Sequence, residues 1–179
     1  MIIGICGLKQ SGKTTVAEYL RNDYGFDRLN FKDALIDEMK ENFPDVLSEL
    51  ADVYNCKVDD LFLEKPPLVR YLLQNYGTEV RRKDDKDYWV RAYGKKIDSI
   101  NSRRIATDDV RFLNEADAIK NAGGILIRVV NPDVVADDMH QSEIEGGEIE
   151  VDFTLVARTG NKKGLFKQMN KVLDTIKAD

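Results

Sequence analysis

The 179-residue sequence contains little cysteine and little histidine: two cysteines, Cys6 and Cys56, and a single histidine, His140. Two cysteines cannot build a disulfide framework, so we expect both to be free thiols in a reducing compartment. One histidine gives little support for a histidine-based metal cluster or for a Ser-His triad. The chemistry of this chain is therefore expected to rest on other residue types.

Long apolar runs and long basic runs are also missing. No stretch approaches the roughly 18 apolar residues that a membrane helix needs, and the amino terminus leads directly into a predicted core strand, so we expect no signal peptide and no membrane partner. The net charge is −5, which argues against a nucleic-acid polymer as partner. A cytoplasmic protein of one domain is expected, either monomeric or a homodimer.

The chain does contain a glycine-rich motif, G-x-x-x-x-G-K-[ST], at residues 7–14. It follows the apolar run of residues 1–6 and precedes a helical pattern. Glycines let successive backbone N–H groups turn toward an anion, and the new helix adds its positive N-terminal end. The motif predicts a binding site for the phosphates of a nucleoside triphosphate, made by Gly7, Lys9, Ser11, Gly12, Lys13, Thr14 and Thr15.

Two residues of this motif carry specific roles. Lys13 is predicted to place its charge on the β- and γ-phosphates of the nucleotide, and the hydroxyl of Thr14 to hold Mg²⁺. The alternative is a chance glycine-rich turn, which the strand before the motif and the helix after it disfavour.

Apolar runs alternate with helical patterns, which predicts an α/β fold with a parallel sheet. The expected strands are residues 2–6, 28–31, 105–107, 125–130 and 153–157. The first helix is expected from Lys13 to Tyr24, with Gly25 at its C-terminal cap, and the last from Lys163 to Lys177.

The sequence predicts two insertions into this single domain of residues 1–179. The first, residues 33–103, has helical patterns and almost no strand character, and by analogy of fold it would receive a second substrate. The core is then about residues 1–32 and 104–179. The second, residues 131–150, is acidic and contains Gly146 and Gly147, which suits either a lid that excludes water or a solvated loop.

Charged residues follow the third predicted strand, where ligands of an α/β sheet collect. Asp109 could hold Mg²⁺ or orient an acceptor oxygen, and Arg111 could bind a phosphate with both arms. An ordinary loop ion pair, with Asn114 and Glu115 capping the next helix, explains the same residues without function.

A second group lies in the helical insertion. Arg70 and Gln74 share one face of a helix and could bind a phosphate and a base edge, and Trp89 could stack on a base. The competing interpretations are a solvent-exposed helix face for the first two and a core position for the tryptophan.

Four strings in this order carry a family resemblance: residues 72–82 (LLQNYGTEVRR), 89–90 (WV), 109–115 (DVRFLNE) and 140–143 (HQSE). The chain resembles the deoxynucleoside monophosphate kinases of the bacteriophage type, which are P-loop nucleotide kinases, over nearly its whole length. The resemblance implies a three-layer fold with a five-stranded parallel sheet, a helical monophosphate-binding insertion and a short lid. It also implies Mg²⁺-dependent transfer of the γ-phosphoryl of ATP to a deoxynucleoside 5′-monophosphate, in the host cytoplasm if a phage encodes the protein.

The resemblance also implies roles for individual residues. The catalytic set is Lys13, Asp109, Arg111 and Arg70, with Thr14 and Asp109 at the metal. The adenine lies near the loop that contains Arg158 and Gly160. The implied substrate-binding residues are Asp33, Arg70, Gln74, Thr78, Glu79, Arg82, Trp89 and, on the lid side, Glu143.

The sequence departs from the family pattern at two places. Lys32 stands where a small residue is usual, and no asparagine directly follows the strand that begins at Phe153. Two other functions stay open: a P-loop kinase of another small phosphorylated acceptor, such as phosphomevalonate or dephospho-coenzyme A, and a regulatory module that hydrolyses a nucleotide. The absence of an Asn-Lys-x-Asp string counts against a GTPase.

Overall fold

The computed structural model describes residues 1–135 and 141–178. Five strands form one sheet: β1 (Ile2–Cys6), β2 (Asp27–Arg28), β3 (Ile105–Thr107), β4 (Ile125–Val130) and β5 (Phe153–Val156). Their order is β2-β3-β1-β4-β5, and each neighbouring pair is parallel. β1 therefore lies at the centre, between β3 and β4. In open α/β sheets, ligands bind at the carboxyl ends of the strands where the strand order reverses, and here that place is the carboxyl end of β1.

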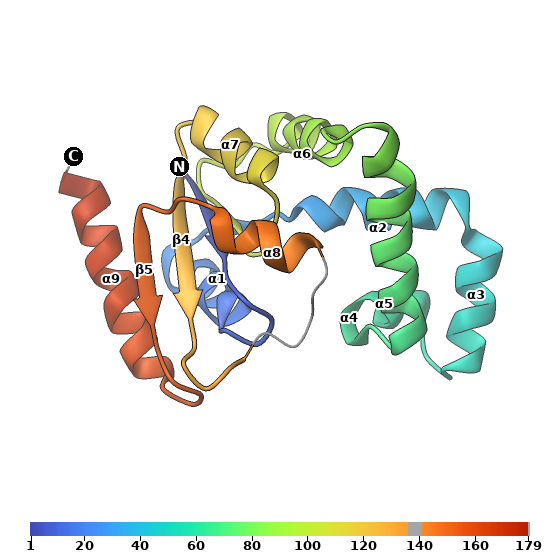
Figure 1. The fold of residues 1–179 in the computed structure, drawn as a ribbon, viewed down its shortest axis with the longest axis horizontal. Helices are drawn as coiled ribbons and strands as arrows, with labels where there is room; N and C mark the ends of the chain where they lie inside the picture. The colour runs from blue at the N-terminus through green and yellow to red at the C-terminus, as the bar shows by residue number, and fades with distance from the viewer. Residues whose placement is uncertain (136–140, 179) are drawn as a thin grey trace. The chain divides into compact units, whose positions relative to one another are not determined.

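Helices cover both faces of this sheet (Figure 1). On one face, α1 (Lys13–Tyr24) and α9 (Lys162–Ala178) pack on the buried residues of the strands. On the other face lies α7 (Leu113–Asn121), whose Ile119 comes close to Gly4 of β1, and α8 (Gln141–Glu148) packs beside α7. The strands are rich in β-branched residues because both of their faces are buried.

The chain divides into two compact units. The first is Met1–Asn30 with Ile97–Asp179, and it contains the sheet. The second, Phe31–Lys96, is helical in the described structure: α2 (Phe31–Asn42), α3 (Pro44–Val53), α4 (Val58–Glu64), α5 (Pro67–Gln74), the π-helix η1 (Asn75–Arg82) and most of α6 (Tyr88–Ser99).

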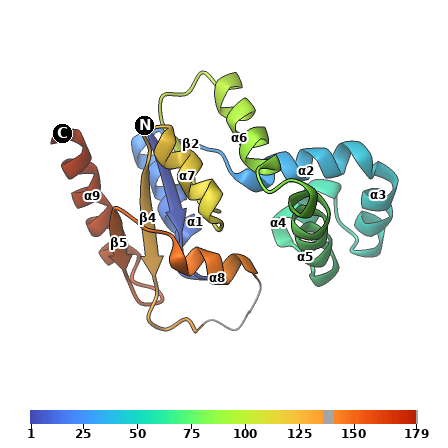
Figure 2. The ribbon, with the colours of Figure 1, turned by 45° about the horizontal axis from the view of Figure 1, so that its top comes forward.

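Two apolar clusters hold the helical unit together. One joins α3, α4 and α5 through Leu47, Leu61 and Val69, and these three helices lie side by side in Figure 2. The other joins α2 to α6 through Leu35 and Trp89. Prolines stand at the first positions of α3 and α5, where the fixed φ of proline suits a helix start.

The predicted α/β class and parallel sheet are confirmed, and β1, β3, β4 and α1 have the predicted bounds. Gly25 ends α1 with a φ of 67°, as expected. The prediction for β2 is wrong at its end: strand pairing covers Asp27–Arg28, and Phe31 already begins α2. Phe31 is buried because it stacks on Tyr93 of α6, so its apolar character belongs to a helix contact rather than to a strand.

The second insertion, residues 131–150, contains a helix, since α8 includes both Gly146 and Gly147. His140 lies outside the described residues, as does the side chain of Glu143. Across residues 1–135 and 141–178, no helix combines the length and the apolar character that crossing a membrane would require.

Candidate active site

The glycine-rich loop follows β1 at the carboxyl edge of the sheet. Gly7 has a φ of 136° and Gly12 a φ of 107°, backbone angles that side chains rarely permit. A Cβ atom on Gly7 would lie 2.3 Å from the carbonyl oxygen of Val129 in β4. The loop thus requires glycine at this position both for its turn and for its close contact with the neighbouring strand.

The polar side chains of the loop are arranged around its backbone. The Lys13 Nζ donates to the carbonyl oxygens of Gly7 (2.7 Å) and Leu8 (2.6 Å), which fixes the ammonium group over the loop. Ser11 is 5% exposed, and its Oγ has no hydrogen-bond partner among the described residues. A buried hydroxyl without a partner is costly, which makes this Oγ a candidate contact for a ligand oxygen.

Thr14, at the start of α1, is joined to the end of β3. Its Oγ1 donates a 2.7 Å hydrogen bond to Oδ2 of Asp108, whose side chain is only 2% exposed. Arg28 of β2 binds the same carboxylate with two arms, Nε to Oδ1 at 2.9 Å and Nη2 to Oδ2 at 2.8 Å. The backbone N–H of Asp108 donates to Oδ1 of the buried Asn30 (2.9 Å).

The acid in contact with Thr14 is therefore Asp108 and not its neighbour Asp109, which the sequence analysis placed at the metal. The reason is the alternation of side chains along an extended chain. Ala106, two residues before Asp108, belongs to the core that includes α1, so Asp108 points to the same side as α1. Asp109 is also buried at this strand end, but as the next residue of an extended chain it follows the opposite phase of the side-chain alternation.

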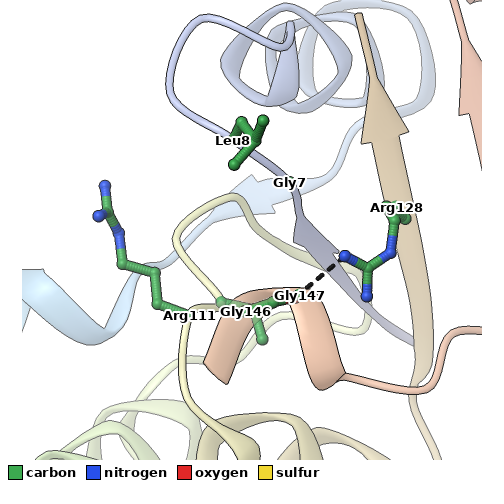
Figure 3. Close-up of a pocket in the computed structure, with 7 residues that line it drawn as sticks. Gly7, Leu8, Arg111, Arg128, Gly146 and Gly147 are labelled. Carbon is green, nitrogen blue, oxygen red and sulfur yellow. Dashed lines mark hydrogen bonds between the residues drawn. The ribbon is translucent and has the colours of Figure 1, made fainter. Parts of the chain in front are cut away.

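A pocket opens beside the loop, lined by Gly7, Leu8, Val110, Arg111, Arg128, Gly146 and Gly147. Figure 3 shows the guanidinium of Arg128 directed toward the glycines of α8, while that of Arg111 extends away from them. Two arginines next to a phosphate-binding loop give the pocket positive charge, which suits the oxygens of a phosphoryl group.

Arg128 was missed by sequence reasoning, although it is the only charged residue in the apolar run Ile125–Val130. Its Nη1 donates to the carbonyl oxygen of Gly146 (3.0 Å) and its Nη2 to that of Ile149 (2.5 Å). The first carbonyl lies in the last turn of α8, where no further helical turn binds it, and the second lies one residue beyond the helix. Arg128 thus ties α8 to β4, in register with Cys6 of β1.

The loop after β5 contains the residues predicted near the adenine. Arg158 is exposed and forms an ion pair with Asp133, and Gly160 has a φ of 83°. The backbone N–H of Thr159 also donates to Asp133 (3.0 Å), and its hydroxyl accepts from the amide of Asn131 (3.0 Å). Lys9 is exposed at the tip of the glycine-rich loop, and Thr15 is half-buried in α1.

The remaining predicted residues lie in the helical unit. Arg70 is exposed on α5, whereas Gln74 at the end of the same helix is half-buried. The π-helix η1 contains Thr78 and Arg82, both half-buried, and the exposed Glu79. Asp33 is half-buried in the first turn of α2.

The structure places Trp89 in the core and so corrects the prediction that it stacks on a base. Its side chain is 3% exposed, and its Nε1 donates to the carbonyl oxygen of Gly77 in η1 (2.9 Å). Trp89 therefore fixes the π-helix against α6. Helices of the π type occur often at functional sites.

Comparison with known proteins shows the family to which the chain belongs. The family model for deoxynucleotide monophosphate kinases matches residues 57–167. A protein of Acanthamoeba polyphaga mimivirus, named as a candidate deoxynucleotide monophosphate kinase, is 36% identical over 163 residues, which cover 81% of each chain. The chain belongs to the deoxynucleotide monophosphate kinase family. The resemblance drawn from the sequence is thereby confirmed, and of the three functions left open the deoxynucleotide kinase is selected.

The chain was also compared with solved structures. TT1252 from Thermus thermophilus has a TM-score of 0.50 at 19% identity, covering 98% of this chain and 97% of its own. The shikimate kinase of Aquifex aeolicus has a TM-score of 0.49 at 14% identity and covers 99% of both chains. The first likeness supports the α/β fold alone.

The helical unit of the kinase contains a polar cluster that sequence reasoning missed. Glu38 of α2 accepts hydrogen bonds from the hydroxyls of Tyr76 and Tyr88, both 2.6 Å, and pairs with Arg81 of η1. The Arg81 guanidinium lies 5.2 Å from the ring centre of Tyr76 and 5.0 Å from that of Tyr88. This cluster connects α2, η1 and α6, and no periodicity in the sequence indicates it.

The cluster favours the charged form of Glu38. Burial alone would raise the pKa of this carboxyl, but the hydrogen bonds from Tyr76 and Tyr88 and the pairing with Arg81 outweigh burial, so its pKa lies below the ordinary value of 4.5. Because the folded state binds this proton less tightly than the unfolded state, the carboxylate stabilises the fold above the unfolded pKa. That contribution is lost as the pH falls through the folded pKa.

We therefore expect Glu38→Gln to lower the free energy of unfolding at neutral pH by about 1.5–3 kcal/mol, the range for hydrogen bonds to a charged group. Its deficit relative to wild type should shrink as the pH falls below 4.5, the ordinary pKa of a glutamate, because the wild-type carboxylate then becomes protonated. Urea unfolding at several pH values measures this. Asp37→Asn is the matched control: Asp37 directly precedes Glu38 in α2, its side chain is 65% exposed, and its pair with Lys96 should contribute at most about 1 kcal/mol. A deficit that is the same at every pH would contradict the assignment.

Proposed function

We propose that this kinase transfers the γ-phosphoryl group of ATP to the 5′-phosphate of a deoxynucleoside monophosphate, with Mg²⁺ as the cation. One observation carries the proposal: in a member of this kinase family, the hydroxyl of Thr14 is hydrogen-bonded to the buried Asp108 directly beside Lys13 and the glycine-rich loop. Phosphoryl transfer needs positive charge and fixed geometry more than covalent chemistry, and this edge of the sheet offers both.

The donor half of the site is formed by the loop and the start of α1. Lys13 would neutralise charge on the β- and γ-phosphates, and the loop N–H groups and the Ser11 hydroxyl would bind phosphate oxygens. Arg158 and Gly160 are the residues proposed to border the adenine. Arg111 and Arg128, which line the pocket beside the loop, supply further positive charge for a transferring phosphoryl group.

The residues around Thr14 suit Mg²⁺. The Thr14 hydroxyl and the Asp108 carboxylate are hard oxygen donors, and the described residues contain no group of three or more His, Cys, Asp or Glu side chains that could form a metal cage. Mg²⁺ prefers one or two protein oxygens together with substrate phosphates and water. When bound, the ion would offset the negative charge that develops on the phosphate oxygens during transfer.

The acceptor half is proposed to lie on the helical unit, with Arg70 and Gln74 of α5 and Thr78, Glu79 and Arg82 of η1. The family model begins at residue 57 and includes these helices. Arg70 is exposed on its helix, so its guanidinium is accessible to a monophosphate in solution.

The first experiment measures ADP release from ATP in the presence of each deoxynucleoside 5′-monophosphate, coupled to detection of the diphosphate product. At least one monophosphate should stimulate ADP release above the rate in its absence. Lys13→Ala should lower kcat/KM by about 10²–10³-fold, because charge stabilisation of the transferring group is lost. Lys167→Ala, an exposed lysine of α9, serves as the control. If no monophosphate raises ADP release, the proposed reaction is wrong.

A second experiment addresses the acceptor half. Arg70→Ala should raise the KM for the monophosphate by about 10–100-fold, the cost of losing a hydrogen bond to a charged group, and leave the KM for ATP unchanged. Arg91→Ala removes an exposed arginine of α6 in the same unit and should change neither KM. An unchanged monophosphate KM in Arg70→Ala would exclude this residue from the acceptor site.

A further inference from the structure

Arg28 is the least expected residue at the phosphate-binding edge. It ends the two-residue strand β2, and its side chain reaches across to the end of β3. Both of its bonds to Asp108 are short, 2.9 Å from Nε and 2.8 Å from Nη2, and they occupy both carboxylate oxygens. The two-armed geometry fixes the plane of the carboxylate as well as its position.

The same carboxylate sets the direction of the Thr14 hydroxyl. Oδ2 of Asp108 accepts both from Arg28 Nη2 and from Thr14 Oγ1 (2.7 Å), so a rotation of the carboxylate would change both contacts. The side chain of Asn30 also holds the backbone of Asp108, accepting a 2.9 Å hydrogen bond from its N–H. A chain of contacts therefore runs from the edge strand to the first turn of α1. The guanidinium of Arg28 binds the carboxylate of Asp108, which accepts the hydrogen bond from the hydroxyl of Thr14.

Stability alone explains this ion pair poorly. The Asp108 side chain is 2% exposed and that of Arg28 is 29% exposed, so the carboxylate has lost nearly all of its water. The desolvation of a buried ion pair cancels much of its attraction, and apolar replacements are often as stable. A fixed orientation of the carboxylate is something that an apolar pair could not provide.

We propose that Arg28 is a positioning residue for the cation–phosphate end of the site: through Asp108 it holds the Thr14 hydroxyl in the orientation that binds the magnesium–nucleotide complex. The inference rests on the proposed function only in taking a magnesium-bound nucleotide as the ligand. It makes no use of the acceptor.

The test is a binding measurement that needs no turnover. ADP affinity is measured with and without Mg²⁺ by calorimetry, and the ratio of the two dissociation constants gives the gain due to the cation. Arg28→Lys keeps the charge but loses the two-armed geometry. We expect it to reduce this gain by about 10–100-fold, the usual effect of removing the partner that orients a metal ligand, while metal-free ADP binding stays as in wild type.

Further variants separate positioning from general support of the fold. Arg28→Gln, which keeps a donor but removes the charge, is measured alongside, and circular dichroism checks the folding of each variant. Arg104→Lys is the matched control, because Arg104 precedes β3 and its Nη1 donates to the carbonyl oxygen of Tyr24 (2.8 Å), at the other end of the strand. If Arg28 acts through Thr14, then in a Thr14→Val background Arg28→Lys should cause no further loss of the gain.

The proposal is overturned if the folded Arg28 variants keep the magnesium gain of wild type, or if they weaken metal-free and magnesium-bound ADP equally. It is also overturned if the losses in Arg28→Lys and Thr14→Val simply add. Failure of the proposed function is a separate outcome, since it would appear as wild-type protein that binds magnesium–ADP but phosphorylates no monophosphate.

Discussion

The hydrogen bond from Thr14 to Asp108 joins the parts on which the site depends. It connects the first turn of α1 to the end of β3 and thereby fixes how the glycine-rich loop leaves β1. The bond is possible because β1 and β3 are parallel neighbours whose carboxyl ends meet at one edge. Arg28 extends the connection to β2, so three strands and one helix contribute to a single constellation.

The surrounding fold supplies the conditions for this bond. Apolar residues pack α1 against the sheet, which leaves Thr14 little freedom to move away from Asp108. The contact of Gly7 with the carbonyl of Val129 holds the loop on β4 at the other side. Next to it, Arg128 binds the carbonyl oxygen of Gly146 in the last turn of α8 and that of Ile149 just after the helix, so the segment that borders the pocket is attached to the same strand. The proposed donor half is thus built on strand ends, which suits the close tolerances of phosphoryl transfer.

Much of the fold and the position of the glycine-rich loop could be predicted from the sequence, because periodicity and glycine motifs are local signals. The sheet, α1 with its Gly25 cap and the glycine-rich loop all follow from such signals. Which of Asp108 and Asp109 contacts Thr14 depended on which face of a short strand meets α1, and counting back to the buried Ala106 would have predicted that contact. Arg128 could also have been predicted as a functional residue, because it is a charged residue inside an apolar run. The cluster around Glu38 could not be predicted, because its members are separated by up to 50 residues in the chain.

Trp89 shows the opposite case, in which a residue type suggested function and the packing gave it a structural role. A lone tryptophan beside a predicted nucleotide site suits base stacking, yet its indole is buried and hydrogen-bonded to Gly77. Burial of large aromatic rings stabilises a small helical unit, and this demand outweighs the local suggestion of the sequence. The half-buried Thr78 and Arg82 are carried by the π-helix that Trp89 holds in place.

The central claim is that Asp108 is the acid that works with Thr14 at the cation. The most direct measurement compares Asp108→Asn with Asp109→Asn, two changes of equal chemistry at adjacent residues, by the gain in ADP affinity that Mg²⁺ provides. The account predicts that Asp108→Asn loses most of this gain and that Asp109→Asn keeps it. The reverse order would contradict the account and return the cation to Asp109.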